Sequence, residues 1–365
     1  MARTRMKIAF IIGTRPEIIK MGPLIKEARR RGIPFSLIHS NQHYSYDMDE
    51  IFFTELGLPP ADFNLKVGSG GHANQTGNIL IKLEPVLEAV APNVVLAQGD
   101  TNTTLAAGLA AAKLTSRLGH VEAGLRSYDR TMPEETNRVV VDHLSDYLFA
   151  VTDRQRRILL DESIAAEAIH VVGNTVVDAL RQSIETSDRR SAILDRLGLG
   201  TKRFFLATIH RSANVDHAET LREVLNVLAA IVKRHGLDVV WPIHPRTLKK
   251  VDEFRMTIPA GVKTGAPLGY FDFLKLEKEA LCIVTDSGGL QEEACVLNVP
   301  CITLRENTER PETVEVGANI LVGRDSEKAL AAIDALLEKG GGWDQPYGDG
   351  HTALKILDIL EKDFR

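Results

Sequence analysis

Short apolar runs alternate along the chain with longer stretches in which apolar positions recur at helical spacing. In the first half, the strands expected from this pattern are Lys7–Ile12, Phe35–His39, Val94–Ala97, Leu118–Val121, Tyr147–Val151 and Ile169–Val172. The helices expected between them are Pro16–Arg31, Tyr46–Leu56, Gly77–Val90, Thr103–Leu114 and Glu135–Leu144. Strands that alternate with helices in this way predict βαβ units and a parallel sheet.

A polar, charge-rich stretch over Ser183–Gly200 interrupts the alternation, which then restarts. The later strands are expected at Phe204–Ile209, Val239–Ile243, Cys282–Thr285, Pro300–Leu304 and Asn319–Val322. The later helices are expected at Thr220–Arg234, Tyr270–Glu279, Leu290–Leu297, Ser326–Lys339 and, after a Gly340–Gly342 loop, Thr352–Lys362. Because 365 residues suit two domains, we place one α/β domain at residues 1–178 and a second at 179–351.

Composition narrows the class of protein. Apolar residues make up 44% and charged residues 25%, with a net charge of −5, as in ordinary soluble globular proteins. We therefore expect neither nucleic acid nor an anionic membrane as a partner, and any anionic ligand must meet a local cluster of cations. The three cysteines have no metal-ligand spacing, which argues against a zinc site or a disulfide framework and fits the reducing cytoplasm. No apolar run reaches the roughly 18 residues of a membrane span.

Polar residues gather where the first-half strands end, which is where parallel sheets bind their ligands. Arg15 and Lys20 follow the first strand and can offer charge to a phosphate or carboxylate, although a capped helix with solvated cations also explains them. Asp100 follows a later strand, where capping of the next helix is the alternative. Glu122 ends a strand and Glu134 begins a helix. If these three carboxylates converge, their repulsion raises at least one pKa and creates a general acid or base, but Glu134 can equally complement a helix N-terminus.

The second half carries a sharper signal at Thr285-Asp-Ser-Gly-Gly-Leu-Gln-Glu-Glu293. Here a buried strand turns through glycines into a helix, so that backbone N–H groups can hold a diphosphate at the positive end of the helix dipole. Glu292 or Glu293 can accept hydrogen bonds from ribose hydroxyls, and Arg310 supplies a fixed charge. A glycine turn with acids near a helix end is the alternative. His210 with Arg211, and His244, also follow strands. No nicotinamide-dinucleotide or P-loop fingerprint is present.

Six motifs occur in order and together resemble one family. They are Gly13-Thr-Arg-Pro-Glu17, Gln98-Gly-Asp100, His120-Val-Glu-Ala-Gly-Leu-Arg126, Pro133-Glu-Glu-Thr-Asn-Arg138, the Thr285–Glu293 run and Thr308-Glu-Arg-Pro-Glu312. The chain resembles the non-hydrolysing UDP-N-acetylglucosamine 2-epimerases from about residue 6 to residue 325. The resemblance implies a GT-B fold with two Rossmann-like domains, an active site in the cleft between them and a final helix, in residues 352–365, that returns to the first domain. It also implies a homodimer that needs no cofactor.

The resemblance assigns roles to individual residues. It implies catalysis by Asp100, Glu122, Glu134 and His210, and substrate binding by Arg15, Lys20, Phe273, Ser287, Gly288, Gly289, Glu293 and Arg310. Within this set Phe273 looks like the residue that lines the uracil pocket and Glu293 like the residue on the ribose. Gln42, Arg211 and His244 match parts of a second, activating substrate site of bacterial relatives. The segment Gln42-His-Tyr-Ser45 and Asn74 depart from the pattern of that site, which puts allosteric activation in doubt.

The implied reaction is the interconversion of UDP-N-acetylglucosamine (UDP-GlcNAc) and UDP-N-acetylmannosamine (UDP-ManNAc). C2 of the sugar is not adjacent to a carbonyl, so its proton is not acidic enough for simple removal and return. Elimination of UDP from C1 as the C2 proton leaves, through a glycal with a C1–C2 double bond, avoids this difficulty. The alternatives are an epimerase for a related UDP-2-acetamido sugar, a hydrolysing epimerase, a GT-B glycosyltransferase and a nucleotide-sugar-binding regulator without turnover.

Overall fold

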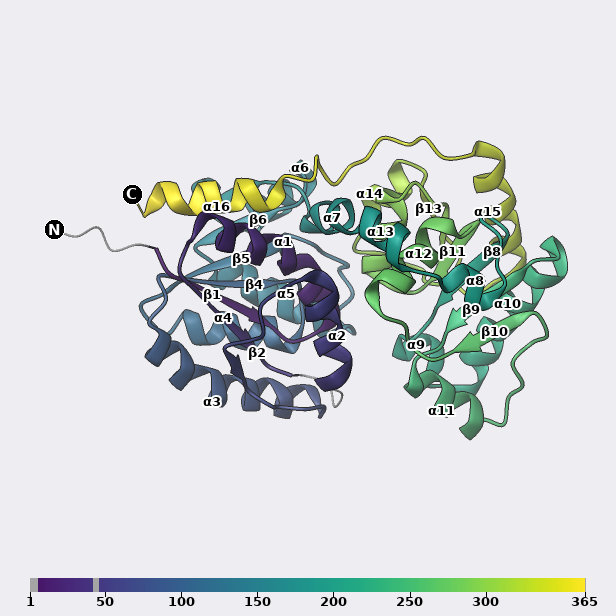
Figure 1. Cartoon of the computed structure of the whole chain (residues 1–365), viewed down its shortest axis with the longest axis horizontal. Helices are drawn as coiled ribbons and strands as arrows, with labels where there is room; N and C mark the ends of the chain where they lie inside the picture. Colours follow the sequence, from purple (N-terminus) through teal and green to yellow (C-terminus); the bar gives the residue numbers. More distant parts are fainter. Residues whose placement is uncertain (1–5, 42–45, 365) are drawn as a thin grey trace. The chain divides into compact units, whose positions relative to one another are not determined.

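The computed structural model of the chain describes residues 6–41 and 46–364. The chain divides into two compact units, Met1–Arg181 with Tyr347–Arg365, and Gln182–Pro346. The boundaries expected from the sequence, at residues 178 and 351, lie a few residues away from these. Each unit has its own sheet and its own helices (Figure 1).

The first unit is built on a seven-stranded sheet with the order β3-β2-β1-β4-β5-β6-β7. Every strand pair in it is parallel. The strands are β1 (Ile8–Ile12), β2 (Phe35–His39), β3 (Phe63–Asn64), β4 (Val94–Gln98), β5 (Arg117–Ala123), β6 (Tyr147–Ala150) and β7 (Ile169–Val171). The helices are α1 (Arg15–Arg31), α2 (Tyr46–Leu56), α3 (His72–Val90), α4 (Asn102–Ala111), α5 (Pro133–Leu144), α6 (Asp153–Asp161), α7 (Thr175–Arg190), which runs on into the second unit, and α16 (Thr352–Asp363).

The second unit repeats the plan with a six-stranded sheet in the order β10-β9-β8-β11-β12-β13, again parallel throughout. Its strands are β8 (Phe204–Thr208), β9 (Asp238–Pro242), β10 (Val262–Gly265), β11 (Cys282–Thr285), β12 (Cys301–Thr303) and β13 (Asn319–Leu321). Its helices are α8 (Ile193–Leu197), α9 (Ser212–Val215), α10 (Ala218–His235), α11 (Pro245–Glu253), α12 (Tyr270–Glu279), α13 (Gly288–Val296), α14 (Pro311–Glu315) and α15 (Ser326–Lys339). The predicted class, parallel α/β with two Rossmann-like domains, is confirmed.

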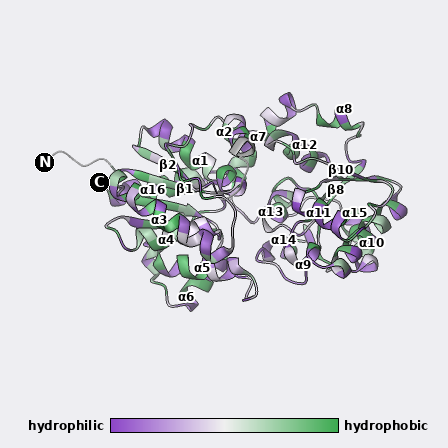
Figure 2. Cartoon of the chain, turned by 90° about the horizontal axis from the view of Figure 1, so that it is seen from below, coloured by the Kyte–Doolittle hydropathy of each residue, from purple (hydrophilic) through white to green (hydrophobic). Residues whose placement is uncertain are grey.

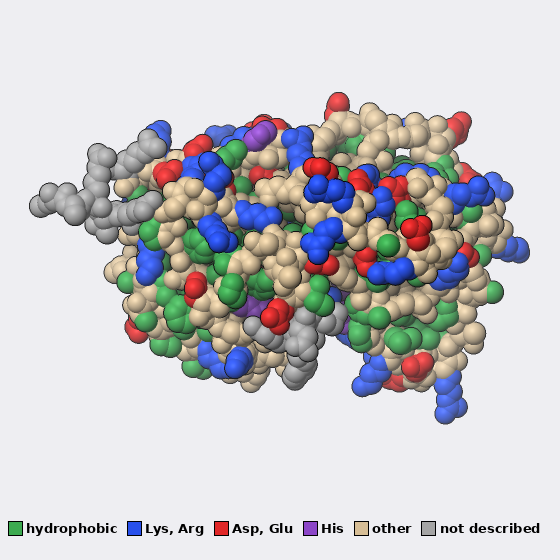
Figure 3. Space-filling view, viewed as in Figure 1, with side chains coloured by type: hydrophobic (Ala, Val, Ile, Leu, Met, Phe, Trp, Pro, Cys, Tyr) green, Lys and Arg blue, Asp and Glu red, His purple; other side chains and the backbone are tan. Residues whose placement is uncertain are grey.

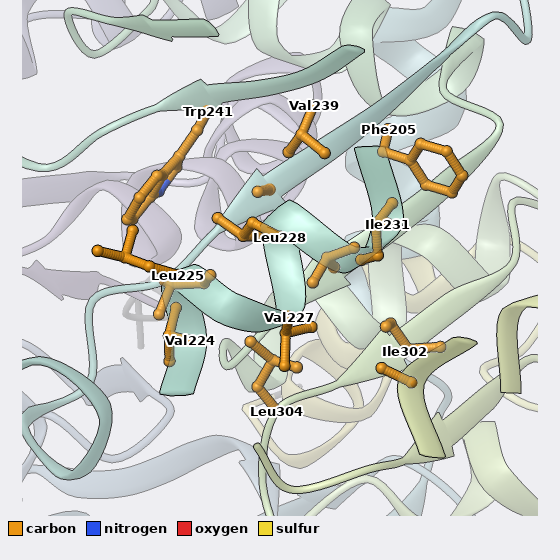
Figure 4. Packing of buried hydrophobic residues seen from close by; sticks show 14 of the residues in the cluster. Phe205, Val224, Leu225, Val227, Leu228, Ile231, Val239, Trp241, Ile302 and Leu304 are labelled. Carbon is orange, nitrogen blue, oxygen red and sulfur yellow. The ribbon is translucent and has the colours of Figure 1, made fainter. Parts of the chain in front are cut away.

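The cores lie between each sheet and its helices. In the second unit, Leu225 and Leu228 of α10 pack against the buried side chains of Trp241, Val239 and Phe205 from the sheet (Figure 4). The hydropathy colouring shows helices with apolar and polar residues interspersed (Figure 2). Such an amphipathic helix buries one stripe and leaves the other to water. On the face seen in Figure 3, basic and acidic side chains lie next to one another.

Helix α16 packs on α1 although the two helices lie at opposite ends of the sequence. Arg31 of α1 pairs with Asp358 at 2.6 Å and with Glu361 at 2.8 Å. The carboxylate of Asp178 accepts hydrogen bonds from the backbone N–H groups of Thr352 (3.2 Å) and Ala353 (3.0 Å) and so caps the start of α16. The last helix is therefore an integral part of the first unit.

The polar stretch after residue 182 is mostly helical. Helix α7 continues to Arg190, and α8 follows it. A few buried apolar side chains, such as Ile193 in α8, are enough to pack this polar segment against the core. The sequence pattern also missed the first half of α7, the helices α6, α9, α11 and α14, the two-residue β3 and β10. In β10 only Val262 is buried and the next three residues are exposed, so this edge strand lacks an apolar run.

Candidate active site

In each sheet the strand order reverses at one point, between β1 and β4 in the first unit and between β8 and β11 in the second. Open parallel sheets bind their ligands beyond the carboxyl ends of the strands at this point. Arg15 follows β1 and Asp100 follows β4, while His210 follows β8 and Ser287 follows β11. The topology thus selects the same loops as the sequence did.

Three side chains hold the carboxylate of Glu122. Its Oε2 accepts hydrogen bonds from Lys20 Nζ at 2.5 Å, Gln98 Nε2 at 3.1 Å and Asn174 Nδ2 at 3.3 Å. Both Lys20 and Glu122 are buried. Glu122 has a φ of 73°, where the register of β5 against β6 shifts. A residue other than glycine adopts this backbone only at a cost, and the three hydrogen bonds hold the side chain in place.

Asp100 is held by the motif at the start of α5. The guanidinium of Arg138, which is buried, bridges Asp100 and Glu135. The side-chain amide of Asn137 donates to the carbonyl oxygen of Asp100 at 2.9 Å. Asp100 and Glu122 therefore each face a cation of their own, Arg138 and Lys20.

Glu134, the third predicted carboxylate, is only partly buried in the first turn of α5. Its neighbour Glu135 is the buried acid, and it accepts hydrogen bonds from the backbone N–H groups of Ser127 (2.9 Å) and Tyr128 (2.8 Å). Glu135 thus organises the preceding loop, and Glu134 is the less buried of the two acids.

The turn after β1 is organised by Glu17. Its carboxylate accepts hydrogen bonds from the N–H groups of Gly13 (2.7 Å) and Thr14 (2.6 Å) and from Thr101 Oγ1 (2.6 Å). Burial raises the pKa of Glu17 although these hydrogen bonds lower it. Glu17 therefore ties the β1–α1 turn to the β4–α4 turn. Arg15 lies at the start of α1, with its guanidinium 5.4 Å from the ring centre of Phe52.

A buried hydrogen-bond network that the sequence did not predict supports the loop after β4 and the residues on both sides of Glu122. His120 Nδ1 lies 2.6 Å from Asp142 Oδ1, and its Nε2 lies 2.7 Å from the carbonyl oxygen of Gly99. Asp142 Oδ2 also accepts from Arg126 (2.7 Å) and from the N–H of Gly124 (3.1 Å). Burial opposes the ionisation of Asp142, but His120 and Arg126 hold its pKa below the usual value. Asp142 thus hydrogen-bonds to His120 and to Gly124, which lie two residues before and two residues after Glu122 in the sequence.

Replacing Asp142 with Asn should lower the free energy of unfolding by about 3–5 kcal/mol, because the substitution leaves the buried guanidinium of Arg126 without this anion. Urea denaturation measures this loss. The matched control is Glu162→Gln, which removes the other acid on Arg126; Glu162 is 25% exposed, so we expect a cost of about 0–1 kcal/mol. Equal losses in the two variants would show that Asp142 has no special structural role.

In the second unit, Asp286 fixes the loop that carries His210. Its carboxylate accepts from the backbone N–H groups of His210 (3.1 Å) and Arg211 (3.0 Å) and from the side chain of Asn214 (3.0 Å). The ring of His210 is 49% exposed, and its Nδ1 lies 3.5 Å from Asp286 Oδ1. The aspartate orients this imidazole and leaves the ring accessible.

Three guanidinium groups gather around Glu309. Arg305 lies 2.7 Å and Arg211 3.3 Å from its carboxylate oxygens. Burial alone would raise the pKa of Glu309, but Arg211, Arg310 and Arg305 together lower it well below its usual range. Arg310 also pairs with Glu292, with 2.6 Å between Nε and Oε1. The cluster thus concentrates three cations in a chain that is acidic overall, with Glu309 and Glu292 as their paired anions and with Asp286 accepting from the backbone N–H of Arg211.

The cluster of Glu309 and its three arginines lies beside the N-terminus of α13. Ser287 is the N-cap of this helix, and Gly288 and Gly289 begin it. A Cβ atom on Gly288 would lie only 2.2 Å from Glu309 Oε1, so the glycine allows the acid and its cations to approach the helix end. N–H groups of a helix's first turn together with nearby guanidinium groups are suited to a phosphate or diphosphate. Arg305 and Glu309 were given no role from the sequence, because the partner that brings them to the site, Arg211, lies 98 positions from Glu309 and leaves no local pattern.

The remaining predicted residues lie around α11, α12 and α13. Phe273 of α12 is partly buried against the apolar cluster that includes Leu290, and Glu293 of α13 is partly exposed. His244 is the N-cap of α11, exposed, and accepts from the N–H of Arg246. Gln42, the other second-site candidate, lies outside the described residues. Arg211 belongs to the cluster around Glu309 described above.

Within residues 6–41 and 46–364, no group of three or more His, Cys, Asp or Glu side chains is arranged to hold a metal ion. In the same part of the chain, no helix has both the length and the apolar character to cross a membrane. All three cysteines are buried thiols, and burial raises the pKa of Cys282 and of Cys295 to about 12.

A family model described as UDP-N-acetylglucosamine 2-epimerase matches residues 26–361. The chain belongs to this family. The UDP-N-acetylglucosamine 2-epimerase of Methanococcus maripaludis is 49% identical over 360 residues, which cover 97% of this chain and 98% of that protein. The crystal structure of the Methanocaldococcus jannaschii UDP-GlcNAc 2-epimerase in complex with UDP-GlcNAc and UDP matches with a TM-score of 0.93 at 48% identity, covering 98% of this chain and all of that one.

A third epimerase of the comparison differs in its substrate. The UDP-2,3-diacetamido-2,3-dideoxy-D-glucuronate 2-epimerase of Pseudomonas aeruginosa is 37% identical, over 98% of this chain and 100% of that protein. The resemblance read from the six motifs and the GT-B assignment are thus confirmed.

Proposed function

We propose that this epimerase interconverts UDP-GlcNAc and UDP-ManNAc by eliminating UDP and adding it back. The observation that carries the proposal is the pair of carboxylates in the first unit, Asp100 and Glu122, each held by its own buried cation. Inversion at C2 requires a group that removes the proton on one face and a group that returns a proton on the other. Two separately held carboxylates satisfy this requirement.

The second unit supplies what the leaving group needs. As the C1–O bond breaks, UDP departs with the bonding electrons, and its negative charge must be stabilised. The N-terminus of α13 at Ser287, Gly288 and Gly289, together with Arg310, is the proposed diphosphate site. Arg305 and Arg211 extend the positive charge around it. Glu293 is the proposed ribose contact, and Phe273 the proposed uracil contact.

The elimination balances without an external oxidant. One carboxylate takes the C2 proton, the C2–H electrons form the C1–C2 double bond, and UDP leaves C1. Return of a proton to the opposite face of C2 and attack of the UDP oxygen on C1 give the other epimer. Lys20 pairs with Glu122 and Arg138 pairs with Asp100, so each proposed proton-transfer group is held in place by a cation. Glu134 and Arg15 are proposed to contact the sugar and the diphosphate.

His210 is proposed to act next to the diphosphate. Its half-exposed ring is oriented by Asp286, which is the arrangement that lets an imidazole donate a proton or a hydrogen bond to a departing phosphate oxygen. A homodimer is proposed on the family resemblance alone.

A second substrate, a UDP-2,3-diacetamido sugar, is supported by the 37% identical Pseudomonas enzyme. The uronate carboxylate at C6 of that sugar would need a cation of its own in the site. Parallel assays with this sugar and with UDP-GlcNAc decide between the two substrates. A faster turnover of the diacetamido sugar would replace UDP-GlcNAc as the proposed substrate.

The reaction itself is tested by incubating the protein with UDP-GlcNAc in D2O and following the products by NMR. We expect UDP-ManNAc to form and deuterium to enter C2 of both epimers. Free ManNAc with UDP would instead indicate a hydrolysing epimerase. Absence of exchange and of product would refute the proposed function.

A further inference from the structure

Helix α12 carries a buried acid that the proposed reaction does not use. Glu277 is 1% exposed, and no N–H or hydroxyl group of the described residues hydrogen-bonds to either of its carboxyl oxygens. The group that acts on it is another acid, the carboxyl of Glu293 on α13, next to the apolar cluster that Leu276 of α12 shares with Leu290 and Ala294 of α13. Two carboxylates only accept hydrogen bonds and repel each other, so this pair requires a proton between them.

Burial decides which acid keeps the proton. Glu277 is enclosed, and both burial and the charge of Glu293 raise its pKa well above the usual value. Glu293 is partly exposed, so water can solvate its negative charge. Glu277 is therefore the neutral donor and Glu293 the ionised acceptor.

The other charged groups around α12 are engaged elsewhere. On α12 itself, Asp272 pairs with Arg196 of α8, while Lys275 and Lys278 pair with Asp188 of α7 and Lys275 also pairs with Glu279. Lys202 donates to carbonyl oxygens at the end of the helix, and Glu292 of α13 pairs with Arg310. The strands β8 and β11 face α12 with apolar side chains, among them Phe204 and Ile283, and the same cluster includes the Cys301 thiol of β12, whose pKa burial raises well above its usual value. Glu293 is the charge that acts on Glu277.

We propose that Glu277 is a positioning residue for nucleotide recognition: it donates its O–H to one carboxylate oxygen of Glu293 and aims the other at a ribose hydroxyl. The inference rests on the proposed function, in which Glu293 contacts the ribose of UDP. Phe273 precedes Glu277 by one helical turn and so lies on the same face of α12. Helix α12 then contributes to the recognition of both parts of the nucleoside: Phe273 contacts the base, and Glu277 positions Glu293, which contacts the ribose.

The test uses the intact chain and three variants. Glu277→Gln keeps a hydrogen-bond donor that cannot ionise, and Glu277→Leu removes the donor. Glu279→Gln is the matched control, since it makes the same change two residues along the same helix, at a carboxylate 3.3 Å from Lys275. Calorimetry gives the affinities for UDP, 2′-deoxy-UDP and 3′-deoxy-UDP between pH 7 and 9, above the phosphate pKa of about 6. Urea denaturation gives the stability of each protein between pH 5 and 8.

We expect Glu277→Leu to bind UDP about tenfold more weakly and to lose most of its preference for UDP over the deoxy analogue that lacks the contacted hydroxyl. Glu277→Gln should restore both, and Glu279→Gln should behave as the wild type. The native chain holds a proton on Glu277 that the unfolded chain releases above about pH 4.3. As the pH rises, wild-type stability should therefore fall relative to Glu277→Gln, by about tenfold in the folding equilibrium constant for each pH unit below the native pKa.

Two results would overturn the inference. Identical pH dependence of stability in the wild type and Glu277→Gln would show that Glu277 is not protonated. An unchanged ribose preference in Glu277→Leu would show that it does not position Glu293. If the wild type binds no UDP, the proposed function itself fails, and with it the ribose contact, whereas the stability measurement still decides the protonation of Glu277.

Discussion

Replacing Glu122 with Gln should lower turnover of UDP-GlcNAc by about 10²–10⁴-fold, the range expected when a general acid or base is removed. The amide has nearly the same shape, and its oxygen can still accept the hydrogen bond from Lys20, but it cannot take a proton from carbon. UDP affinity should stay near the wild-type value, because the proposed diphosphate site at Ser287, Gly288, Gly289 and Arg310 lies in the second unit and Arg15 is unchanged. NMR in D2O measures the exchange at C2, and calorimetry measures UDP binding. Near-normal conversion of UDP-GlcNAc to UDP-ManNAc would rule out proton transfer by Glu122.

The companion variant Asp100→Asn assigns the two faces of C2. If Glu122 serves one epimer and Asp100 the other, each variant should block elimination from one epimer only. Each variant is therefore supplied with UDP-GlcNAc and with UDP-ManNAc in separate reactions, and glycal formation is followed. Loss of both directions in the same variant would mean that one carboxylate serves both faces. Chemical denaturation checks the fold, since removing one member of a buried ion pair can cost about 3–5 kcal/mol.

Replacing Gly288 with Ala should impair both stability and UDP binding. The new Cβ would lie 2.2 Å from Glu309 Oε1. Glu309 is buried and held by Arg305 at 2.7 Å, so it cannot withdraw without breaking this ion pair. Overpacking of this kind costs about 1–3 kcal/mol. We expect UDP affinity to fall at least tenfold, because the guanidinium groups move with Glu309.

Gly289→Ala is the steric control for this prediction. The nearest heavy atom to its added Cβ, apart from chain neighbours, is Ser287 Oγ at 4.0 Å. The same substitution, one residue along, should leave stability unchanged or raise it by up to about 1 kcal/mol through helix propensity. Denaturation curves of the two variants, with and without UDP, make the comparison. Equal stability of Gly288→Ala and Gly289→Ala would show that Glu309 moves freely and that the cation cluster is not rigid.

The pattern of apolar residues predicted most strands of both sheets, because a buried parallel strand must be apolar on both faces. The structure begins β2 and β11 at the predicted residues, Phe35 and Cys282. The pattern did not predict the elements that bury only one face or only a few residues. Helix α7 buries Val176, Val177 and Leu180 in its first half and continues as a polar helix, so its second half could not be separated from a linker by composition.

For the site, the motifs located the loops but not the pairings within them. Glu122 was singled out at the end of a strand, yet its partner Lys20 lies 102 positions away in the sequence. Glu134 and Glu135 are adjacent acids, and spacing alone cannot tell which one turns inward to Arg138. Asp142 ends no strand and belongs to no quoted motif, so its role depends on contacts that only folding creates.

The docking of α16 onto α1 affects the order in which the chain can fold during its synthesis. The second unit, Gln182–Pro346, is continuous in sequence and is complete before the last helix is made. The first unit begins earlier but lacks α16 until residues 352–363 have left the ribosome. Until then Arg31 has no Asp358 or Glu361 to bind, and the surface of α1 that α16 covers stays open to solvent. Although domains generally fold from the N-terminus onward, in this chain the N-terminal unit is completed only after the second unit.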